Sequence, residues 1–345
     1  MTTSDTASTA ALDLRATTAA LITGCWSTQV IYAAVELGIA DELGTDAKSA
    51  AQIAQARGTH TRATFRLLRA LASLGLCTHL GGDRFELTAA GRLLRNDVPG
   101  SLVALARHWG TRTWPALAHL PQSVKTGAAW AHGGREGFLS MAERPDEAAV
   151  LNRSMVQQTL QVARAIVAAY DFSGVREAID LGGGYGALLS VLLESHPRLR
   201  GASADLAYME REALAFLQER GVADRGRFIA TDFFKSVPAG ADAYLLKYII
   251  HDWDDADAIE ILRNTSRAAG AHGRVLIIER IIPERIDARR EHATIACGDV
   301  NMMVATGGLE RTAPEYEALL AAAGLKLTQL IPTASEFSIL EARIA

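Results

Sequence analysis

A glycine-rich loop at residues 180–186 is well suited to holding a nucleotide-like ligand. The run DLGGGYG lies between a short β-rich segment and a helical one. Glycines at such a junction let the backbone turn sharply and let a ligand approach the helix N-terminus with no Cβ in the way. The spacing Gly182-x-Gly184-x-x-Ala187 also satisfies the dinucleotide fingerprint, so the loop by itself leaves the cofactor open.

Three aspartates, Asp180, Asp205 and Asp232, stand at the ends of three successive β-rich runs. A carboxylate at Asp205 can accept hydrogen bonds from both ribose hydroxyls of an adenosine, while Asp232 and Phe233 place an acid and a ring beside the adenine position. Asp205 taken alone could equally be a strand-end cap. The three together favour an adenosine-containing cofactor. These aspartates would fit NAD as well as any other such cofactor.

His251 opens a run of acidic residues, HDWDDAD, at 251–257. It follows a β-rich run and so lies at the carboxyl end of a strand, where open α/β sheets place their chemistry. The run could be mistaken for a metal site. The simpler interpretation is a helix N-terminus capped by Asp254 and Asp255, because the positive end of the helix dipole favours acids.

The elements around these residues predict an α/β fold for the C-terminal half. From about Arg176, short β-rich runs alternate with helices, which is typical of a doubly wound parallel sheet. The last two runs are separated only by a short turn and predict a hairpin at one edge, a feature foreign to dehydrogenases. The seven runs are 177–181, 200–205, 227–233, 243–250, 274–280, 325–331 and 337–344.

Residues 15–100 predict a mostly helical, winged-helix-like domain, after a tail at 1–14 that we expect to be disordered. Ser49 and Gln52 form a plausible capping box, and a β-hairpin is expected around Gly81-Gly82-Asp83. Residues 1–100 carry nine basic and nine acidic residues, so this region lacks the basic surface that DNA phosphates require. Its first helix presents an apolar face that must pack on something. Dimerisation is therefore the favoured role, and Ile22, Trp26, Ala33 and Leu37 form that face.

Composition narrows the class of protein further. The net charge of −4 argues against nucleic acid or an anionic membrane as partner. We find neither a signal peptide nor an apolar run of the roughly 18 residues that a membrane span needs. The three cysteines are odd in number and lack CxxC spacing, which predicts reduced, buried thiols in a cytoplasmic protein.

Taken together, these motifs resemble the plant-type, caffeate O-methyltransferase-like family, including its bacterial members that modify antibiotics and pigments. The resemblance spans nearly the whole chain, from the helical N-terminal region to the last strand. It rests on DLGGGYG at 180–186, ADL at 204–206, TDFF at 231–234, LKYIIHDWDD at 246–255, IIERIIP at 277–283 and GGLERT at 307–312.

The resemblance implies a Rossmann-like class I methyltransferase domain at 171–345, an N-terminal winged-helix dimerisation domain at 15–100, and a helical linker with pocket residues at 101–170. It implies a homodimer, S-adenosylmethionine as cofactor and no metal ion. The residues expected to contact the cofactor are Gly182, Gly184, Asp205, Leu206, Asp232, Phe233 and Lys247.

The resemblance also implies a catalytic group. His251 would be the general base, flanked by Glu279 and Glu310, which would hold its tautomer and stabilise the imidazolium. Glu279 could instead be a solvated strand end. A phenol has a pKa of about 10 and imidazole about 6.5, so complete prior deprotonation would cost about 5 kcal/mol, which a nearby sulfonium would reduce.

An aromatic or polyketide-like hydroxyl is the favoured acceptor. Trp and Met side chains adapt to flat ligands, although each of them is individually more typical of a core. Asn301 stands where the plant members have an apolar residue. The identity of their substrates therefore cannot be transferred to this chain. The expected acceptor-side residues are Trp109, Met141, Asn152, Met155, Tyr248, Asn301, Met302 and Met303.

Two other functions remain open at this level. Some bacterial relatives bind S-adenosylmethionine and catalyse hydroxylation, decarboxylation or a pericyclic step, although retention of His251 and Glu310 favours methyl transfer. A winged-helix transcription regulator is the other alternative, against which the neutral charge of residues 1–100 argues.

Overall fold

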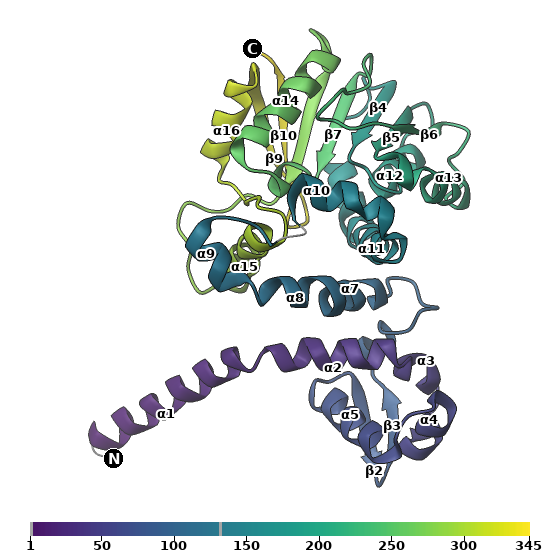
Figure 1. Cartoon of the computed structure of the whole chain (residues 1–345), viewed down its shortest axis with the longest axis vertical. Helices are drawn as coiled ribbons and strands as arrows, with labels where there is room; N and C mark the ends of the chain where they lie inside the picture. The colour runs from purple at the N-terminus through teal and green to yellow at the C-terminus, as the bar shows by residue number, and fades with distance from the viewer. Residues whose placement is uncertain (1–2, 131–132) are drawn as a thin grey trace. The chain divides into compact units, whose positions relative to one another are not determined.

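The structure is a computed structural model that describes residues 3–130 and 133–345. The chain forms two compact units, Met1–Arg112 and Thr113–Ala345. Figure 1 shows the elements of both units in chain order.

The first unit is helical with a small antiparallel sheet in the order β1-β3-β2. Its core is formed by Ile39, Ile53, Leu68 and Phe85, each at most 1% exposed. The elements are α1 (Thr3–Ile22), α2 (Cys25–Glu36), α3 (Ile39–Leu43), β1 (Lys48–Ser49), α4 (Ala50–Arg57), α5 (Thr61–Ser73), β2 (Cys77–Gly81), β3 (Arg84–Leu87), α6 (Ala89–Arg92) and α7 (Val103–His108).

Local sequence signals in this unit are confirmed where they specify a cap or a turn. Ser49 caps α4, and its hydroxyl and the Gln52 side chain form both hydrogen bonds of the capping box. The hairpin predicted around Gly81 is β2 paired with β3. The N-terminal region differs from the expectation of a disordered tail, because α1 is helical from Thr3.

Helices α1 and α2 leave large apolar side chains in solvent. Leu21, Ile22 and Trp26 are 78%, 74% and 69% exposed. The segment Asp13–Glu36 is, contrary to the expectation from the sequence, long and apolar enough to cross a membrane, and only 11% of its most apolar window is buried. Length and composition alone are weak evidence for a span, and an exposed apolar face of this kind is equally typical of an interface between subunits.

The second unit is an α/β domain around a seven-stranded sheet in the order β6-β5-β4-β7-β8-β10-β9. The first five strands are parallel, and β10 and β9 form the predicted antiparallel hairpin at one edge. The strands are β4 (Glu177–Leu181), β5 (Arg200–Asp205), β6 (Gly226–Ala230), β7 (Ala243–Lys247), β8 (Arg274–Glu279), β9 (Leu325–Pro332) and β10 (Ser338–Ile344).

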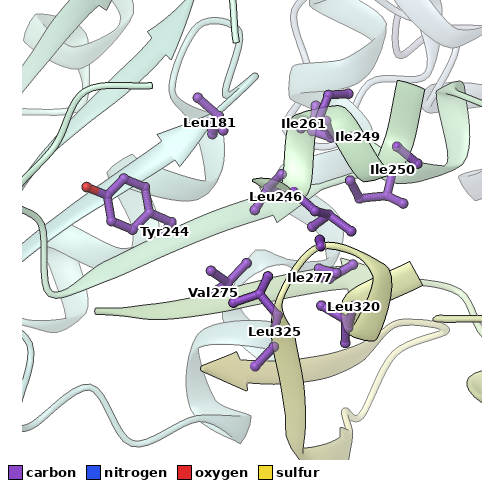
Figure 2. Packing of buried hydrophobic residues seen from close by; sticks show 14 of the residues in the cluster. Leu181, Tyr244, Leu246, Ile249, Ile250, Ile261, Val275, Ile277, Leu320 and Leu325 are labelled. Atoms are coloured by element: carbon purple, nitrogen blue, oxygen red, sulfur yellow. The ribbon is translucent and has the colours of Figure 1, made fainter. Parts of the chain in front are cut away.

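Helices cover both faces of this sheet. Along β8, Val275 and Ile277 pack with residues of α14 and α16, while Leu276 and Ile278 pack with residues of α11 and α12. Figure 2 shows the first of these two cores. The helices of the unit are α8 (Trp114–Leu117), α9 (Leu120–Thr126), α10 (Gly134–Leu139), α11 (Pro145–Ala169), α12 (Ala187–Ser195), α13 (Glu210–Glu219), α14 (Asp255–Ala269), α15 (Arg290–Ala305) and α16 (Ala313–Ala322).

Two expectations about individual residues need correction. Strand β7 ends at Lys247 rather than at 250, because Tyr248 has a φ of 56° and the chain turns there. Cys25 and Cys297 are exposed, and only Cys77 is buried as predicted.

Candidate active site

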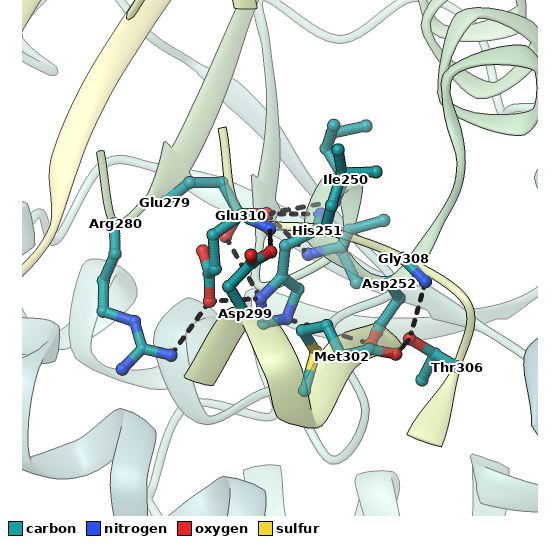
Figure 3. Close-up of polar contacts among 12 residues, drawn as sticks. Ile250, His251, Asp252, Glu279, Arg280, Asp299, Met302, Thr306, Gly308 and Glu310 are labelled. Atoms are coloured by element: carbon teal, nitrogen blue, oxygen red, sulfur yellow. Dashed lines mark hydrogen bonds and ion pairs between the residues drawn. The ribbon is translucent and has the colours of Figure 1, made fainter. Parts of the chain in front are cut away.

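The turn that follows β7 is held by one buried carboxylate. Glu279, the last residue of β8, is fully buried, and its Oε1 accepts hydrogen bonds from the backbone N–H groups of Ile249, Ile250 and His251 at 3.0, 3.0 and 3.3 Å. Figure 3 shows this contact together with the side chains around it. Glu279 therefore positions the backbone of His251, a role that the sequence analysis did not anticipate.

The imidazole of His251 faces three carboxylates. Its Nδ1 lies 3.1 Å from Glu310 Oε1 and 3.9 Å from Glu279 Oε2, while Nε2 lies 3.9 Å from Asp252 Oδ1. The short contact decides the tautomer, because an ionised carboxylate only accepts hydrogen bonds and Nδ1 must then carry the proton. In the neutral ring, Nε2 is the atom that can accept a proton.

These carboxylates dominate the charge of the site. Burial favours the neutral imidazole, but Glu279, Asp252 and Glu310 outweigh it and raise the pKa of His251 to about 9. Burial raises the pKa of Glu279 to about 7 despite the attraction of His251. Burial also opposes the charge of Glu310, yet His251 and Arg280 together lower the pKa of this carboxyl. Of the two glutamates, the one hydrogen-bonded to the imidazole is thus more strongly held as an anion.

Tyr248 covers the imidazole from one side. The two rings are stacked, with centroids 4.4 Å apart and planes 3° from parallel. Among the described residues, Tyr248 is the one non-glycine with a positive φ, a conformation that costs about 1–3 kcal/mol for a bulky side chain. The same conformation both ends β7 and brings the tyrosine ring over the histidine.

Glu310 is held by residues that the sequence analysis did not single out. Its N–H donates to Asp299 Oδ1 at 2.8 Å, and Arg280 Nη2 donates to its Oε1 at 2.9 Å. Arg311 is 1% exposed and donates to the carbonyls of Ile250 and Trp253, so it ties this loop to the turn after β7. Both arginines lie inside the quoted motifs, IIERIIP and GGLERT, which were the signal available for finding them.

The glycine loop forms a cradle at the carboxyl ends of β4 and β5. Gly182, Gly184 and Gly186 have φ of 70°, 54° and 82°, and a Cβ on Gly182 would lie 2.3 Å from Ile249 Cδ1. Asp205 is buried at the end of β5, where its Oδ2 accepts from Gly184 N at 2.8 Å and its Oδ1 from Leu206 N at 2.7 Å. Each oxygen keeps a lone pair for a further donor.

Comparisons with known proteins show which protein family the chain belongs to. A model described as the O-methyltransferase domain matches residues 114–326, and one described as the O-methyltransferase dimerisation domain matches residues 19–97. A phenazine O-methyltransferase of Lysobacter antibioticus is 40% identical over 325 residues, covering 94% of each chain.

The chain belongs to the O-methyltransferase family.

A solved structure shows what a related site holds. An O-methyltransferase from neocarzinostatin biosynthesis, in complex with S-adenosylmethionine and 2-hydroxy-5-methyl naphthoic acid, has a TM-score of 0.78 and 31% identity, covering 92% of this chain and 96% of that one. The protein described here likewise uses S-adenosylmethionine. Its own glycine cradle and its buried Asp205 fit that cofactor.

One relative carries a different printed activity. The aclacinomycin 10-hydroxylase of Streptomyces purpurascens is 32% identical over 327 residues, covering 89% of this chain and 85% of that one.

Of the other predicted cofactor residues, Phe233 lies beside the cradle, with Cε1 3.6 Å from where a Cβ on Gly182 would stand. Lys247 Nζ donates to Thr159 Oγ1 at 3.0 Å, and burial lowers the pKa of Lys247 to about 8. Asp232 lies just beyond β6, 3.2 Å from Lys235 Nζ and 3.4 Å from Arg135 Nη2. The ring of Phe233 packs edge-on against Trp253.

The predicted acceptor residues of the methyltransferase do not all gather at His251. Tyr248 stacks on the imidazole, and Met302 lies beside it in Figure 3. Asn152 instead lies by the cradle, with Oδ1 3.7 Å from where a Cβ on Gly184 would stand, and Met141 is fully buried. Trp109 is 38% exposed in the first unit. The remaining three, Met155, Asn301 and Met303, are half-buried.

The cluster around His251 has the composition of a metal site, and each of its two glutamates keeps a buried second oxygen, Oε2, that has no hydrogen-bond partner among the described residues. His251, Glu279 and Glu310 each offer a ligand atom, and these lie within 4.8 Å of one another. Glu279 Oε1 already accepts three backbone N–H groups, and Glu310 Oε1 already accepts from Arg280. The Arg280 guanidinium would also repel a cation placed there.

Proposed function

We propose that this O-methyltransferase transfers a methyl group to a phenolic hydroxyl of an aromatic or polyketide-like molecule, with His251 as general base. The observation that carries the proposal is the hydrogen bond from His251 Nδ1 to Glu310, which leaves Nε2 as the ring atom that can accept a proton. S-adenosylmethionine, when bound, supplies a methyl group on a positively charged sulfur. His251 Nε2 takes the hydroxyl proton as the acceptor oxygen bonds to that methyl carbon and the carbon–sulfur bond breaks toward sulfur.

The carboxylates around His251 make this proton transfer less costly. A phenol of pKa about 10 and an unperturbed imidazole of about 6.5 differ by about 5 kcal/mol. Raising the pKa of His251 to about 9 leaves a gap of about one unit, or roughly 1.4 kcal/mol. Glu310 and Glu279 thus stabilise the imidazolium that forms. The corresponding cost is that nearly all of the free enzyme holds a protonated base at neutral pH, because a pKa about two units above the pH leaves only about 1% of the imidazole neutral.

Aromatic acceptors are favoured by the relatives and by the side chains at the base. A phenazine and a naphthoic acid appear in the names of similar proteins. Tyr248 and Met302 flank His251 and suit a flat ring. The other proposed acceptor-side residues are Trp109, Met141, Asn152, Met155, Asn301 and Met303.

We further propose that the cofactor is held by Gly182, Gly184, Asp205, Leu206, Asp232, Phe233 and Lys247, without a metal ion. Asp205 would accept from the ribose hydroxyls, since its oxygens keep spare lone pairs. Residues 15–100 would form the dimerisation domain of a homodimer, 101–170 the helical linker and pocket region, and 171–345 the cofactor domain of a cytoplasmic enzyme. The apolar side chains exposed on α1 and α2 support the dimer.

Mass spectrometry of reactions with methyl-labelled S-adenosylmethionine and a panel of phenolic acceptors tests the function. The label should appear on the acceptor oxygen, and His251→Ala should reduce turnover about 10²–10⁴-fold with cofactor affinity unchanged. His272→Ala, at an exposed histidine, is the control and should turn over normally. Product oxidised without label would favour hydroxylation, the second candidate that one relative supports. Near wild-type methylation by His251→Ala would place the base elsewhere.

A further inference from the structure

We propose that Arg280 is a positioning residue that holds Glu310 against His251 and so determines which ring nitrogen receives the proton. The proposal rests on the role proposed for His251. It adds a residue to the reaction that neither the sequence analysis nor the comparisons assign.

Arg280 contacts both groups that flank the imidazole. Its Nη2 lies 2.9 Å from Glu310 Oε1, the same oxygen that lies 3.1 Å from His251 Nδ1. Its guanidinium carbon is 5.2 Å from the ring centroid of Tyr248, which in turn stacks on His251. The side chain is 15% exposed, so these contacts are made largely away from water. Arg280 thereby acts on His251 through its neighbours.

Two neighbouring residues of helix α15, Gly298 and Asp299, lie next to Arg280 and its partner Glu310. A Cβ on Gly298 would lie 3.0 Å from Arg280 Nη2, and glycine leaves that space open. The next residue, Asp299, accepts the N–H of Glu310 at 2.8 Å. The helix therefore provides room for the guanidinium and also fixes the backbone of its carboxylate partner.

Charge gives Arg280 a second effect on the same proton. The imidazole is faced by Glu279 from β8, Asp252 from the turn after β7, and Glu310 from the loop before α16. Arg280 is the guanidinium paired with Glu310 and helps to keep that carboxylate ionised. The other charged or titratable groups nearby are Lys247, whose Nζ lies 4.3 Å from the Tyr248 ring, Tyr248 itself, Asp299, Glu336, Arg311 and Tyr316.

Arg280 therefore limits how strongly three carboxylates hold the imidazole protonated. Without the cation, His251 would keep its carboxylates but lose the positive charge that opposes protonation of its ring. Its pKa would rise, and less of the base would be available at neutral pH. The hydrogen bond that orients Nδ1 would also lose its anchor, since Glu310 Oε1 would have the imidazole as its one remaining side-chain partner among the contacts described here.

Comparison of Arg280→Met with Arg280→Lys tests the proposal. We expect Arg280→Met to lower kcat about 10–100-fold, with KM for both substrates within threefold, and to shift the pH–rate profile toward alkaline pH. Arg280→Lys should keep the wild-type profile but recover kcat only in part, because a lysine is a point charge without the planar fork. NMR titration of the His251 imidazole in the full-length protein should show the same alkaline shift in Arg280→Met alone.

Gly298→Ala gives a second test that leaves the arginine in place. The added methyl group should displace the guanidinium and lower kcat in the same direction but by less, while Cys297→Ala, at an exposed position of the same helix, should match wild type. The proposal would be overturned if Arg280→Met kept kcat within twofold of wild type and showed no shift in its pH–rate profile. It would also be overturned if Arg280→Met raised the KM for the acceptor and left kcat unchanged. If His251→Ala itself stays active, the proposed base fails, but the NMR titration still reports whether Arg280 controls the imidazole.

Discussion

At the scale of single residues, the main feature of the proposed site is one imidazole that faces several carboxylates. Three carboxylates face His251, and one of them shares its oxygen with an arginine. This arrangement makes the ring a stronger base and also keeps it almost fully protonated at neutral pH. The balance between these two effects should be visible in the pH dependence of the rate.

The kcat/KM of the wild-type enzyme should rise with pH through a single ionisation of His251. The base must be neutral to accept a proton, and its pKa lies near 9, so the rising limb should extend well above the unperturbed imidazole value of about 6.5. Glu310→Gln removes a charge that raises this pKa and should move the limb to lower pH, opposite to the shift expected for Arg280→Met. Initial rates measured from pH 6 to about 10 would check this; a wild-type limb centred near 6.5 would contradict it.

Cofactor affinity should depend on Asp205. Its carboxylate holds the glycine loop through Gly184 and keeps lone pairs for ribose hydroxyls. A hydrogen bond to a charged group contributes about 1.5–3 kcal/mol, so Asp205→Ala should weaken S-adenosylmethionine binding roughly ten- to hundredfold. Titration calorimetry would measure the change, with the exposed Asp224→Ala as control. Unchanged affinity in Asp205→Ala would remove this residue from the cofactor site.

At the scale of elements, the decisive feature is the turn that ends β7. Tyr248 leaves the strand in a left-handed conformation, after which three consecutive N–H groups converge on Glu279 Oε1. The carboxylate at the end of β8 therefore sets the direction of the chain that carries His251. The first role of Glu279 is therefore to hold the backbone of this turn, and its charge near His251 is a second effect.

Stability should consequently be more sensitive to Glu279 than to an ordinary strand-end acid. Glu279→Ala leaves three buried N–H groups without their acceptor, at about 1–3 kcal/mol for each one that finds no substitute. We expect a loss of about 3 kcal/mol or more in unfolding free energy. Glu279→Gln keeps an acceptor oxygen and should lose less than half as much. Urea unfolding of the two variants provides the comparison, and equal losses would show that Glu279 does not hold this turn.

At the scale of the whole molecule, the exposed apolar side chains of α1 and α2 require an explanation. Leu21, Ile22 and Trp26 are at least 69% exposed in the single chain, within the segment matched to a dimerisation domain from residue 19 onward. Burial of large apolar side chains contributes about 1.5–3 kcal/mol each. A second copy of the chain is the partner that this match supports.

Light scattering should therefore give twice the chain mass of 36.9 kDa at micromolar concentration. Trp26→Glu should shift the protein toward monomer, because it places a charge in the proposed interface. Leu330→Asp, at a similarly apolar and exposed position of β9, should leave the dimer intact. A wild-type mass near that of one chain would refute the dimer.

The sequence by itself determined the features that depend on neighbouring residues. The hairpin at Gly81, the capping box at Ser49 and Gln52, and the strands β4 and β5 were all predicted with the right bounds or pairing. Such features are encoded within a few residues by turn chemistry, caps and alternation of burial. The glycine loop and the acids that follow the parallel strands were recognisable for the same reason.

The tertiary structure decided how the groups of the proposed catalytic site are held. His251, Arg280 and Glu310 come from separate loops and strand ends, and the sharing of one Glu310 oxygen between the other two follows from how β7, β8 and the loop before α16 pack. Nor could sequence periodicity show that β7 ends before Tyr248, since tyrosine is a good strand former. The groups that stabilise the turn, Glu279 and Arg311, lie far from it in the sequence. Long-range hydrogen bonds overrode local propensity at the residues that position His251, the proposed base.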